Sequence, residues 1–247
     1  MTVRPQHLFI VTGASRGLGR AMALQLLQPG HTVLGLSRQA PAAPPGLEQW
    51  PCDLSHVEPV AARLAQWLAG FAPSHFATAT LINNAALVTE PRPLADTDTA
   101  SLVAAVRVGL EAPLVLTAVF LRAVRSWSGQ GRVLHISSGL GRRGMASAAA
   151  YCAVKAALDN LARAQALEEA QRANGAKVVS LAPGVIDTDM QVQLRGAAAA
   201  DFPDRDTFLQ LKSGGRLDSP EAASAKVLAY LARPDFGDQP VGDVRDA

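Results

Sequence analysis

The chain has 247 residues, a formal net charge of +2, 18% charged residues and 49% hydrophobic residues. This composition is typical of a folded globular protein and argues against intrinsic disorder. The small basic excess forms no Lys/Arg block, so the sequence predicts no nucleic-acid partner. Its two cysteines stand in no Cys-x-x-Cys or Cys/His cluster, which argues against a metal site and a disulfide framework.

The N-terminal segment has neither the apolar core nor the cleavage site of a secretory signal. The long apolar runs are interrupted by Gly, Pro or charged residues, so we expect no membrane-spanning helix and no membrane partner. With two thiols that fit a reducing compartment, these features predict a cytoplasmic protein.

Short apolar segments alternate with helical patterns along the chain. In chain order we expect a strand at 7–12, a helix ending near 29–30, a strand at 32–36, a Pro/Ala loop at 39–46, a helix at 57–71, a strand at 80–83, a helix at 101–124, a strand at 132–137, a helix at 148–173, a strand at 177–182, a helix at 220–231 and a weak strand at 240–244 that is alternatively coil. Strands this apolar are buried on both faces, which is typical of a parallel sheet covered by helices. The predicted fold class is α/β: one Rossmann-type domain over residues 1–247, with a doubly wound parallel sheet and helices on both faces.

Residues 185–218 break this alternation. They contain an alanine run at 197–200, Phe202, Phe208 and the pair Gly214-Gly215. We expect a small helical substrate lid that moves on a glycine hinge, and not a separate domain.

A glycine-rich turn lies between the first predicted strand and the first predicted helix. In such a turn, backbone N–H groups can approach a diphosphate, and the helix N-terminus favours its negative charge. The same pattern also fits a plain strand-to-helix turn. Because the turn stands where a Rossmann sheet binds a dinucleotide, we expect cofactor contacts from Gly13, Ser15, Arg16, Gly17, Leu18 and Gly19.

The second predicted strand ends in Ser37-Arg38. An acidic residue at that point usually binds the ribose hydroxyls of NAD and would repel a 2′-phosphate. Arg38 and Arg16 would instead attract one, since guanidinium matches phosphate oxygens in a bidentate way. The sequence therefore predicts NADP(H), although either arginine also fits a solvated surface charge.

Four further motifs follow in the order expected of one enzyme family. They are Cys52-Asp53-Leu54, Leu81-Ile82-Asn83-Asn84-Ala85-Ala86, Ser138 ahead of Tyr151-Cys152-Ala153-Val154-Lys155, and Pro183-Gly184-Val185-Ile186-Asp187-Thr188. With these residues the chain resembles the short-chain dehydrogenase/reductase family over nearly its whole length. Segments 81–91, 110–117 and 183–195 look most like its sepiapterin reductase and bacterial benzil reductase branch.

The resemblance implies a role for each matching position. Asp53 would lie beside the adenine, and Tyr151 and Lys155 would contact the cofactor as well as act in catalysis with Ser138. Further cofactor contacts would come from Asn84, Ala85, Pro183, Gly184, Val185 and Thr188. Two positions depart from the family pattern. Ala86 replaces a glycine, and Gly109 replaces an asparagine that is thought to hold a water linking the lysine to solvent.

Tyr151 and Lys155 are four residues apart on a predicted helix, so both project from one face. An ammonium group near a phenol lowers its pKa and brings the acid closer to working pH. Ser138, at the end of its strand, is placed to donate a hydrogen bond to a substrate oxygen.

These expectations combine into an NADPH-dependent carbonyl reductase whose substrate is a ketone, a diketone or a pterin-like side chain. Met145 and Met190 are expected in the substrate pocket. The alternative is a catalytically impaired NADP(H)-binding sensor or partner-binding module, motivated by Gly109. The apolar predicted helices at 101–124 and 148–173 also predict a homodimer, with a homotetramer as the alternative.

Overall fold

The computed structural model of the chain describes residues 6–39 and 43–246. Within these ranges, one sheet contains seven parallel strands in the order β3-β2-β1-β4-β5-β6-β7. The strands are β1 (His7–Thr12), β2 (His31–Ser37), β3 (Leu47–Pro51), β4 (Thr78–Asn83), β5 (Gln130–Ile136), β6 (Lys177–Ala182) and β7 (Val241–Asp243). Because the strand order reverses between β1 and β4, the loops that follow these two strands diverge and leave a crevice.

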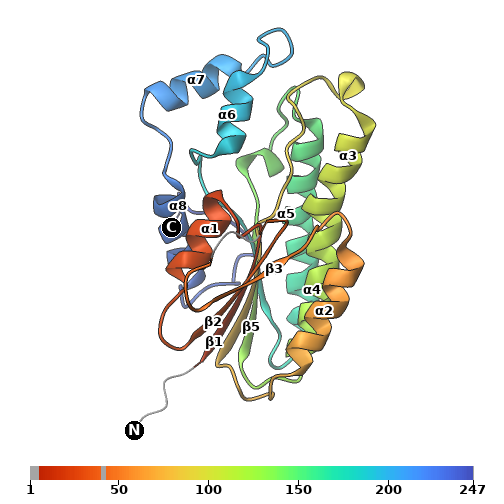
Figure 1. Cartoon of the computed structure of the whole chain (residues 1–247), viewed down its shortest axis with the longest axis vertical. Helices are drawn as coiled ribbons and strands as arrows, with labels where there is room; N and C mark the ends of the chain where they lie inside the picture. The colour runs from red at the N-terminus through yellow and green to blue at the C-terminus, as the bar shows by residue number, and fades with distance from the viewer. Residues whose placement is uncertain (1–5, 40–42, 247) are drawn as a thin grey trace.

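Helices cover both faces of the sheet (Figure 1). The α-helices are α1 (Gly17–Gln25), α2 (Val57–Ala69), α3 (Thr99–Val106), α4 (Ala112–Val124), α5 (Ala149–Glu169), α6 (Asp189–Gly196), α7 (Arg205–Ser213) and α8 (Pro220–Leu231). The pair α1 and α8 covers one face, and α2, α4 and α5 cover the other. Helices α6 and α7 stand beyond the carboxyl edge of the sheet.

The described apolar residues form a core cluster on each face of the sheet. Along β1, Ile10 packs with Leu64 and Phe120 on the face of α2 and α4. Its neighbour Val11 packs with Met22 on the face of α1. All of these side chains are fully buried. Burial on both faces explains why the strand sequences are continuous apolar runs.

The predicted fold class is confirmed, and the structure corrects one detail and decides a second one. The sequence pattern missed β3, a half-buried strand that ends in Pro51 and occupies the edge of the sheet, where a missing N–H is tolerated. The weak strand at 240–244 does form, as β7, and pairs with β6. Part of the predicted loop at 39–46, residues 40–42, lies outside the described residues.

The predicted helix at 101–124 forms with a π-helical turn, η2 (Arg107–Glu111), between α3 and α4. In a regular α-helix the ring of Pro113 would meet the carbonyl group of Gly109, four residues earlier, so the helix widens. A Cβ on Gly109 would lie 2.6 Å from Cγ1 of Val154 on α5. The absence of a side chain at Gly109 therefore lets α5 pack closely on this turn.

This helix, Thr99–Val124, is long and apolar enough to cross a membrane, which corrects the expectation that the chain has no such segment. It packs against α2, α5 and the sheet, and Leu116 and Phe120 are fully buried. It is a core helix of this fold, apolar because it is partly enclosed.

Residues 187–217 form an excursion whose two ends meet. Ile186 and Asp218 pair in a parallel bridge, and the N–H of Asp187 donates to the Asp218 carbonyl at 2.9 Å. Within the excursion, Phe202 is fully buried and its ring centre lies 5.4 Å from that of Phe208. The segment predicted as a lid thus has its own small core and a narrow base.

The packing at Gly109 generates a test by mutation. In an unobstructed helix, Gly→Ala stabilises by about 1 kcal/mol. Because of the contact with Val154, we expect Gly109→Ala to destabilise by about 1–2 kcal/mol in the natural background and to stabilise in a Val154→Ala background. Free energies of unfolding in urea measure both effects. An equal effect of Gly109→Ala in both backgrounds would contradict the packing.

Candidate active site

A cavity of about 1220 Å³ opens at the carboxyl edge of the sheet, where the loops after β1, β2, β4, β5 and β6 meet. Side chains of α6 and α7 close its outer side. Every residue for which the sequence predicts a site role lies on its wall. They are Gly13, Ser15, Arg16, Gly17, Leu18, Gly19, Arg38, Asp53, Asn84, Ala85, Ser138, Met145, Tyr151, Lys155, Pro183, Gly184, Val185, Thr188 and Met190.

The glycine-rich turn has a shape that suits an anion. Gly13 has a φ of +71°, and a Cβ on Gly19 would lie 2.2 Å from the Gly13 carbonyl oxygen. Arg16, at the N-cap of α1, makes no side-chain capping hydrogen bond. The first N–H groups of α1 are therefore available to a ligand, and the turn fits the diphosphate of a dinucleotide.

The ends of β1 and β4 are tied together beneath the cavity. Thr12 Oγ1 accepts the N–H of Asn84 at 2.9 Å and the N–H of Ala85 at 3.0 Å. The Asn84 amide donates in return to the Thr12 carbonyl at 2.9 Å. These bonds set the position of Asn84 and Ala85 relative to the glycine-rich turn. Ala86, which departs from the family pattern, also lines the cavity.

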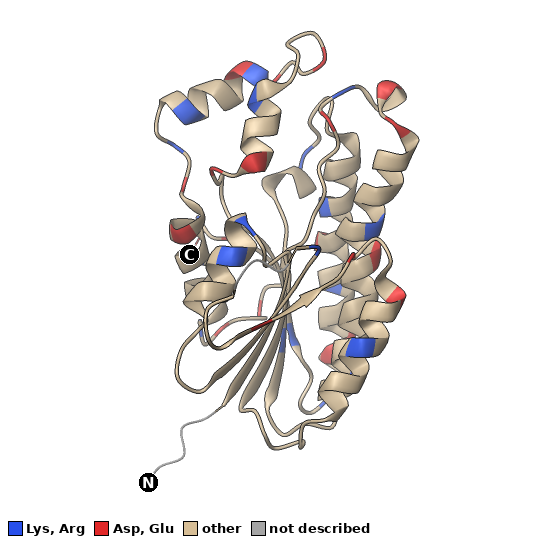
Figure 2. Cartoon of the chain, in the orientation of Figure 1, with Lys and Arg blue, Asp and Glu red and all other residues tan. Residues whose placement is uncertain are grey.

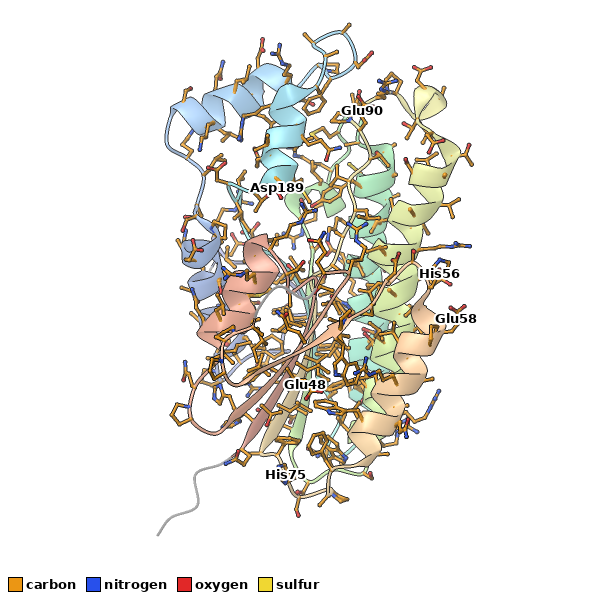
Figure 3. The ribbon with its side chains drawn as sticks, in the orientation of Figure 1. Glu48, His56, Glu58, His75, Glu90 and Asp189 are labelled. Carbon is orange, nitrogen blue, oxygen red and sulfur yellow. The ribbon has the colours of Figure 1, made fainter. Side chains whose placement is uncertain are left out.

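The two arginines predicted for the 2′-phosphate differ in their surroundings. Arg38 is exposed and attracts Asp53, whose pKa is held below its usual range chiefly by hydrogen bonds from Ser55. Nη1 of Arg16 lies 2.7 Å from Oδ2 of Asp189. Figure 3 labels Asp189 at the start of α6. Arg16 thus forms a solvent-exposed ion pair with the lid segment.

The three predicted catalytic side chains come from two elements. Ser138 follows β5 and begins the turn η3 (Gly139–Gly141), and its hydroxyl accepts the N–H of Leu140 at 3.2 Å. Tyr151 and Lys155 lie one turn apart on α5. The Lys155 ammonium is buried, lies 5.5 Å from the Tyr151 ring centre and donates to the Ile136 carbonyl at 2.6 Å.

Burial is the largest influence on the pKa values of Tyr151 and Lys155. It raises the pKa of Tyr151 to about 12, against a hydrogen bond with Ser138, and lowers the pKa of Lys155 to about 8, against the charge of Asp159. The expectation of a lowered pKa for Tyr151 is not met here, because burial of the phenol raises that pKa more than its hydrogen bond with Ser138 lowers it. Tyr151 still holds its proton at neutral pH, which is the state a proton donor needs.

A line of buried polar side chains runs across the sheet beside Lys155. Nδ1 of His135 lies 3.2 Å from the Asn83 amide nitrogen, and Nε2 lies 2.9 Å from Oε1 of Gln165. Burial lowers the pKa of His135 to about 4, so the ring is neutral at pH 7. These groups hydrogen-bond to one another inside the core and do not line the cavity.

Sequence reasoning missed most of the outer part of the cavity. Arg245 was overlooked although it follows β7, and a residue after a parallel strand stands at the same edge as the site. It pairs with Asp243 at 2.6 and 2.8 Å. Figure 2 shows that the charged residues of the chain lie mostly in loops and helices, including the lid helices, and that the strands carry few. The outer cavity also has apolar side chains, Leu87, Leu140, Met145, Met190, Leu194, Phe208 and Leu211, and polar ones, Arg143, Asp187, Asp189, Gln191, Asp204 and Thr207.

Comparisons with known proteins give the relatives of this chain. A model of the short chain dehydrogenase family matches residues 7–199. A benzil reductase ((S)-benzoin forming) of Bacillus cereus is 33% identical over 243 residues, covering 95% of this chain and 96% of the relative. An NADPH-dependent pterin aldehyde reductase of Arabidopsis thaliana is 27% identical over 204 residues, 81% of this chain and 83% of the relative.

Among solved structures, a short-chain dehydrogenase/reductase from Burkholderia vietnamiensis is 35% identical, with a TM-score of 0.62 and 99% of each chain covered. The chain belongs to the short-chain dehydrogenase/reductase family. It is an oxidoreductase that acts on CH–OH or C=O groups, and membership implies a nicotinamide cofactor.

Proposed function

We propose that the protein is an NADPH-dependent reductase of ketones and diketones in which Tyr151 is the general acid. The observation that carries this proposal is the placement of Ser138, Tyr151 and Lys155 on one wall of the cavity that also contains the glycine-rich turn. Similarity to benzil reductase supports a diketone substrate, and similarity to pterin aldehyde reductase supports a pterin-like carbonyl as the alternative.

NADPH, when bound, supplies the hydride to the carbonyl carbon. Tyr151 holds its proton at neutral pH and donates it to the carbonyl oxygen as negative charge develops there. Ser138 donates a hydrogen bond to the same oxygen. The Lys155 ammonium is charged below a pKa of about 8 and stabilises the tyrosinate that remains.

The outer cavity supports a bulky and mainly apolar substrate. Met145, Met190, Phe208 and Leu211 all line its wall, and thioether side chains adapt well to aromatic groups. Because these residues belong to the loop after η3 and to the lid segment, closure of residues 187–217 over a substrate would exclude water from the reacting carbonyl.

The alternative function, an NADP(H)-binding sensor or partner-binding module, was motivated by Gly109. The side chain of Val154 packs where a Cβ of residue 109 would lie, so the departure has a packing explanation. A sensor has no need of the three polar side chains that share the cavity wall, which favours the enzyme.

Tyr151→Phe tests the proton donor. We expect kcat to fall by about 10²–10⁴-fold, the usual contribution of a general acid, while the Kd for NADPH stays within about twofold. Turnover of benzil followed at 340 nm and NADPH fluorescence titration measure the two quantities. The matched control is Tyr230→Phe, which alters the other tyrosine of the chain, outside the cavity. Unchanged turnover in Tyr151→Phe refutes the mechanism.

Arg38→Asp tests the cofactor preference. Loss of a charge-assisted bond to the 2′-phosphate should weaken NADPH binding by about 10–100-fold and leave NADH binding unchanged or tighter. The readout is the ratio of the two Kd values. Arg20→Asp makes the same charge change on α1 at an exposed residue outside the cavity and should leave the ratio unaltered. Equal affinity of the natural protein for both cofactors would remove the claim.

We also propose a homodimer, with a homotetramer as the alternative. Exposed apolar side chains on α3, α4 and α5 support an interface there, namely Val103, Val106, Leu114 and Leu167. Light scattering should give at least twice the mass of one chain, and Leu114→Glu should lower it to that of a monomer. The control, Val192→Glu on α6, should not. A monomeric natural protein at micromolar concentration contradicts the proposal.

A further inference from the structure

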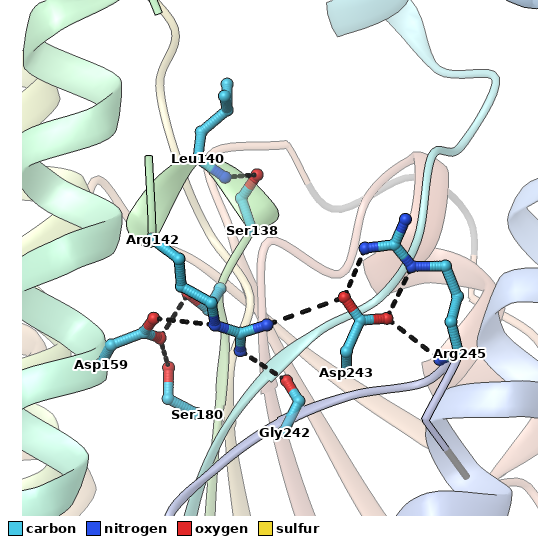
Figure 4. A network of polar contacts seen from close by, with 9 residues as sticks. Ser138, Leu140, Arg142, Asp159, Ser180, Gly242, Asp243 and Arg245 are labelled. Carbon is cyan, nitrogen blue, oxygen red and sulfur yellow. Dashed lines mark hydrogen bonds and ion pairs between the residues drawn. The ribbon is translucent and has the colours of Figure 1, made fainter. Parts of the chain in front are cut away.

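A buried carboxylate lies on α5 one turn beyond Lys155. Asp159 is 2% exposed, and its Oδ1 accepts the hydroxyl of Ser137 at 2.6 Å and that of Ser180 at 2.7 Å (Figure 4). Ser137 ends the run of buried residues along β5, and Ser180 lies on the neighbouring strand β6. The carboxylate is thus bound to both strands that lie beneath α5.

The other oxygen of Asp159 faces the turn that carries Ser138. Oδ2 lies 3.5 Å from Nε of Arg142, and a Cβ on Gly141 would lie 3.0 Å from it. The Arg142 guanidinium also donates to the Gly242 carbonyl at 2.7 Å, so it is held from a second side. Asp159 therefore contacts the Ser138 segment at Ser137, before the catalytic serine, and at Arg142, after it.

The same carboxylate acts on the charge of Lys155. Burial lowers the pKa of Lys155 and the negative charge of Asp159 opposes this effect. The other charged or titratable groups that face Asp159 are Arg142 after η3 and His135 on β5, and His135 is neutral at pH 7. Behind Arg142 stands Asp243 on β7, 3.7 Å away. Asp159 is thus the counter-charge nearest to Lys155 along its own helix.

We propose that Asp159 is a positioning residue that docks the Ser138 turn onto the helix of Tyr151 and Lys155. One carboxylate in this way connects the two elements that carry the three catalytic side chains. The kinetic part of this inference rests on the proposed reductase function, whereas the docking itself is a property of the fold.

Asp159→Asn separates these roles. The amide oxygen can still accept the hydroxyls of Ser137 and Ser180, but the amide nitrogen now faces the Arg142 guanidinium and cannot bind it. The matched control is Gln165→Met, on the same helix as Asp159. It removes a buried hydrogen bond to His135 on β5 and does not touch the Ser138 turn. Arg142→Gln removes the ion pair with Asp159 from the side of the Ser138 turn and serves as an independent variant.

Hydrogen–deuterium exchange tests the docking without any substrate. In Asp159→Asn and in Arg142→Gln we expect at least tenfold faster exchange in the segment 138–145, with β4 and α2 unchanged. Gln165→Met should leave that segment protected. If exchange in 138–145 is unchanged in both test variants, or if Gln165→Met accelerates it equally, Asp159 has no docking role and the inference is overturned.

Kinetics test the consequence for the site. We expect Asp159→Asn to lower kcat about tenfold or more at little change in KM for NADPH. Lys155 is needed in its charged form, so activity falls as pH rises through its pKa of about 8. Without Asp159 the pKa of Lys155 drops, and the alkaline limb of the pH–activity profile should move down by about one pH unit. Gln165→Met should keep the limb in place. If the natural enzyme is active and the alkaline limb of Asp159→Asn is not shifted relative to it, the inference is overturned. If the natural enzyme is inactive, only the proposed function is refuted.

Discussion

The burial of one ammonium group constrains the whole carboxyl edge of this protein. A lysine charge inside a protein is tolerated only where polar partners replace the lost water. The Lys155 ammonium donates to the carbonyl of Ile136, the last residue of β5, at 2.6 Å, and the negative charge of Asp159 favours its charged form. Both conditions require α5 to lie tightly on β5 and β6. That packing places Tyr151 next to Ser138.

Close packing of α5 also explains Gly109, a position that departs from the family pattern. Val154, the neighbour of Lys155, points into the space where a side chain of Gly109 would lie. The π-helical turn at Gly109 follows from Pro113, whose ring forbids a regular turn. A position that looks like a lost relay residue in the sequence therefore has a structural cause in its neighbour.

The cavity has two unlike halves because different parts of the fold build them. The inner half is made of strand ends and the glycine-rich turn, which the sheet holds rigidly and which the bonds between Thr12 and Asn84 tie together. The outer half comes from residues 187–217, anchored through the bridge of Ile186 to Asp218. The strand ends suit a cofactor that is common to the family, and the inserted segment suits a particular substrate.

The sequence by itself was sufficient for the fold class and for the residues of the inner cavity. Apolar runs report burial on both faces, and the glycine spacing, the Tyr-x-x-x-Lys pair and the Pro-Gly turn are local patterns whose geometry follows from a few neighbouring residues. β3 escaped because an edge strand is only half buried and gives no such run. Only the tertiary structure decided the pairing of Arg16 with Asp189, the pKa of Tyr151, and the meeting of Asp159, Arg142 and Gly242. Each of these depends on groups far apart in the chain, whose separation is set by packing and not by any local pattern.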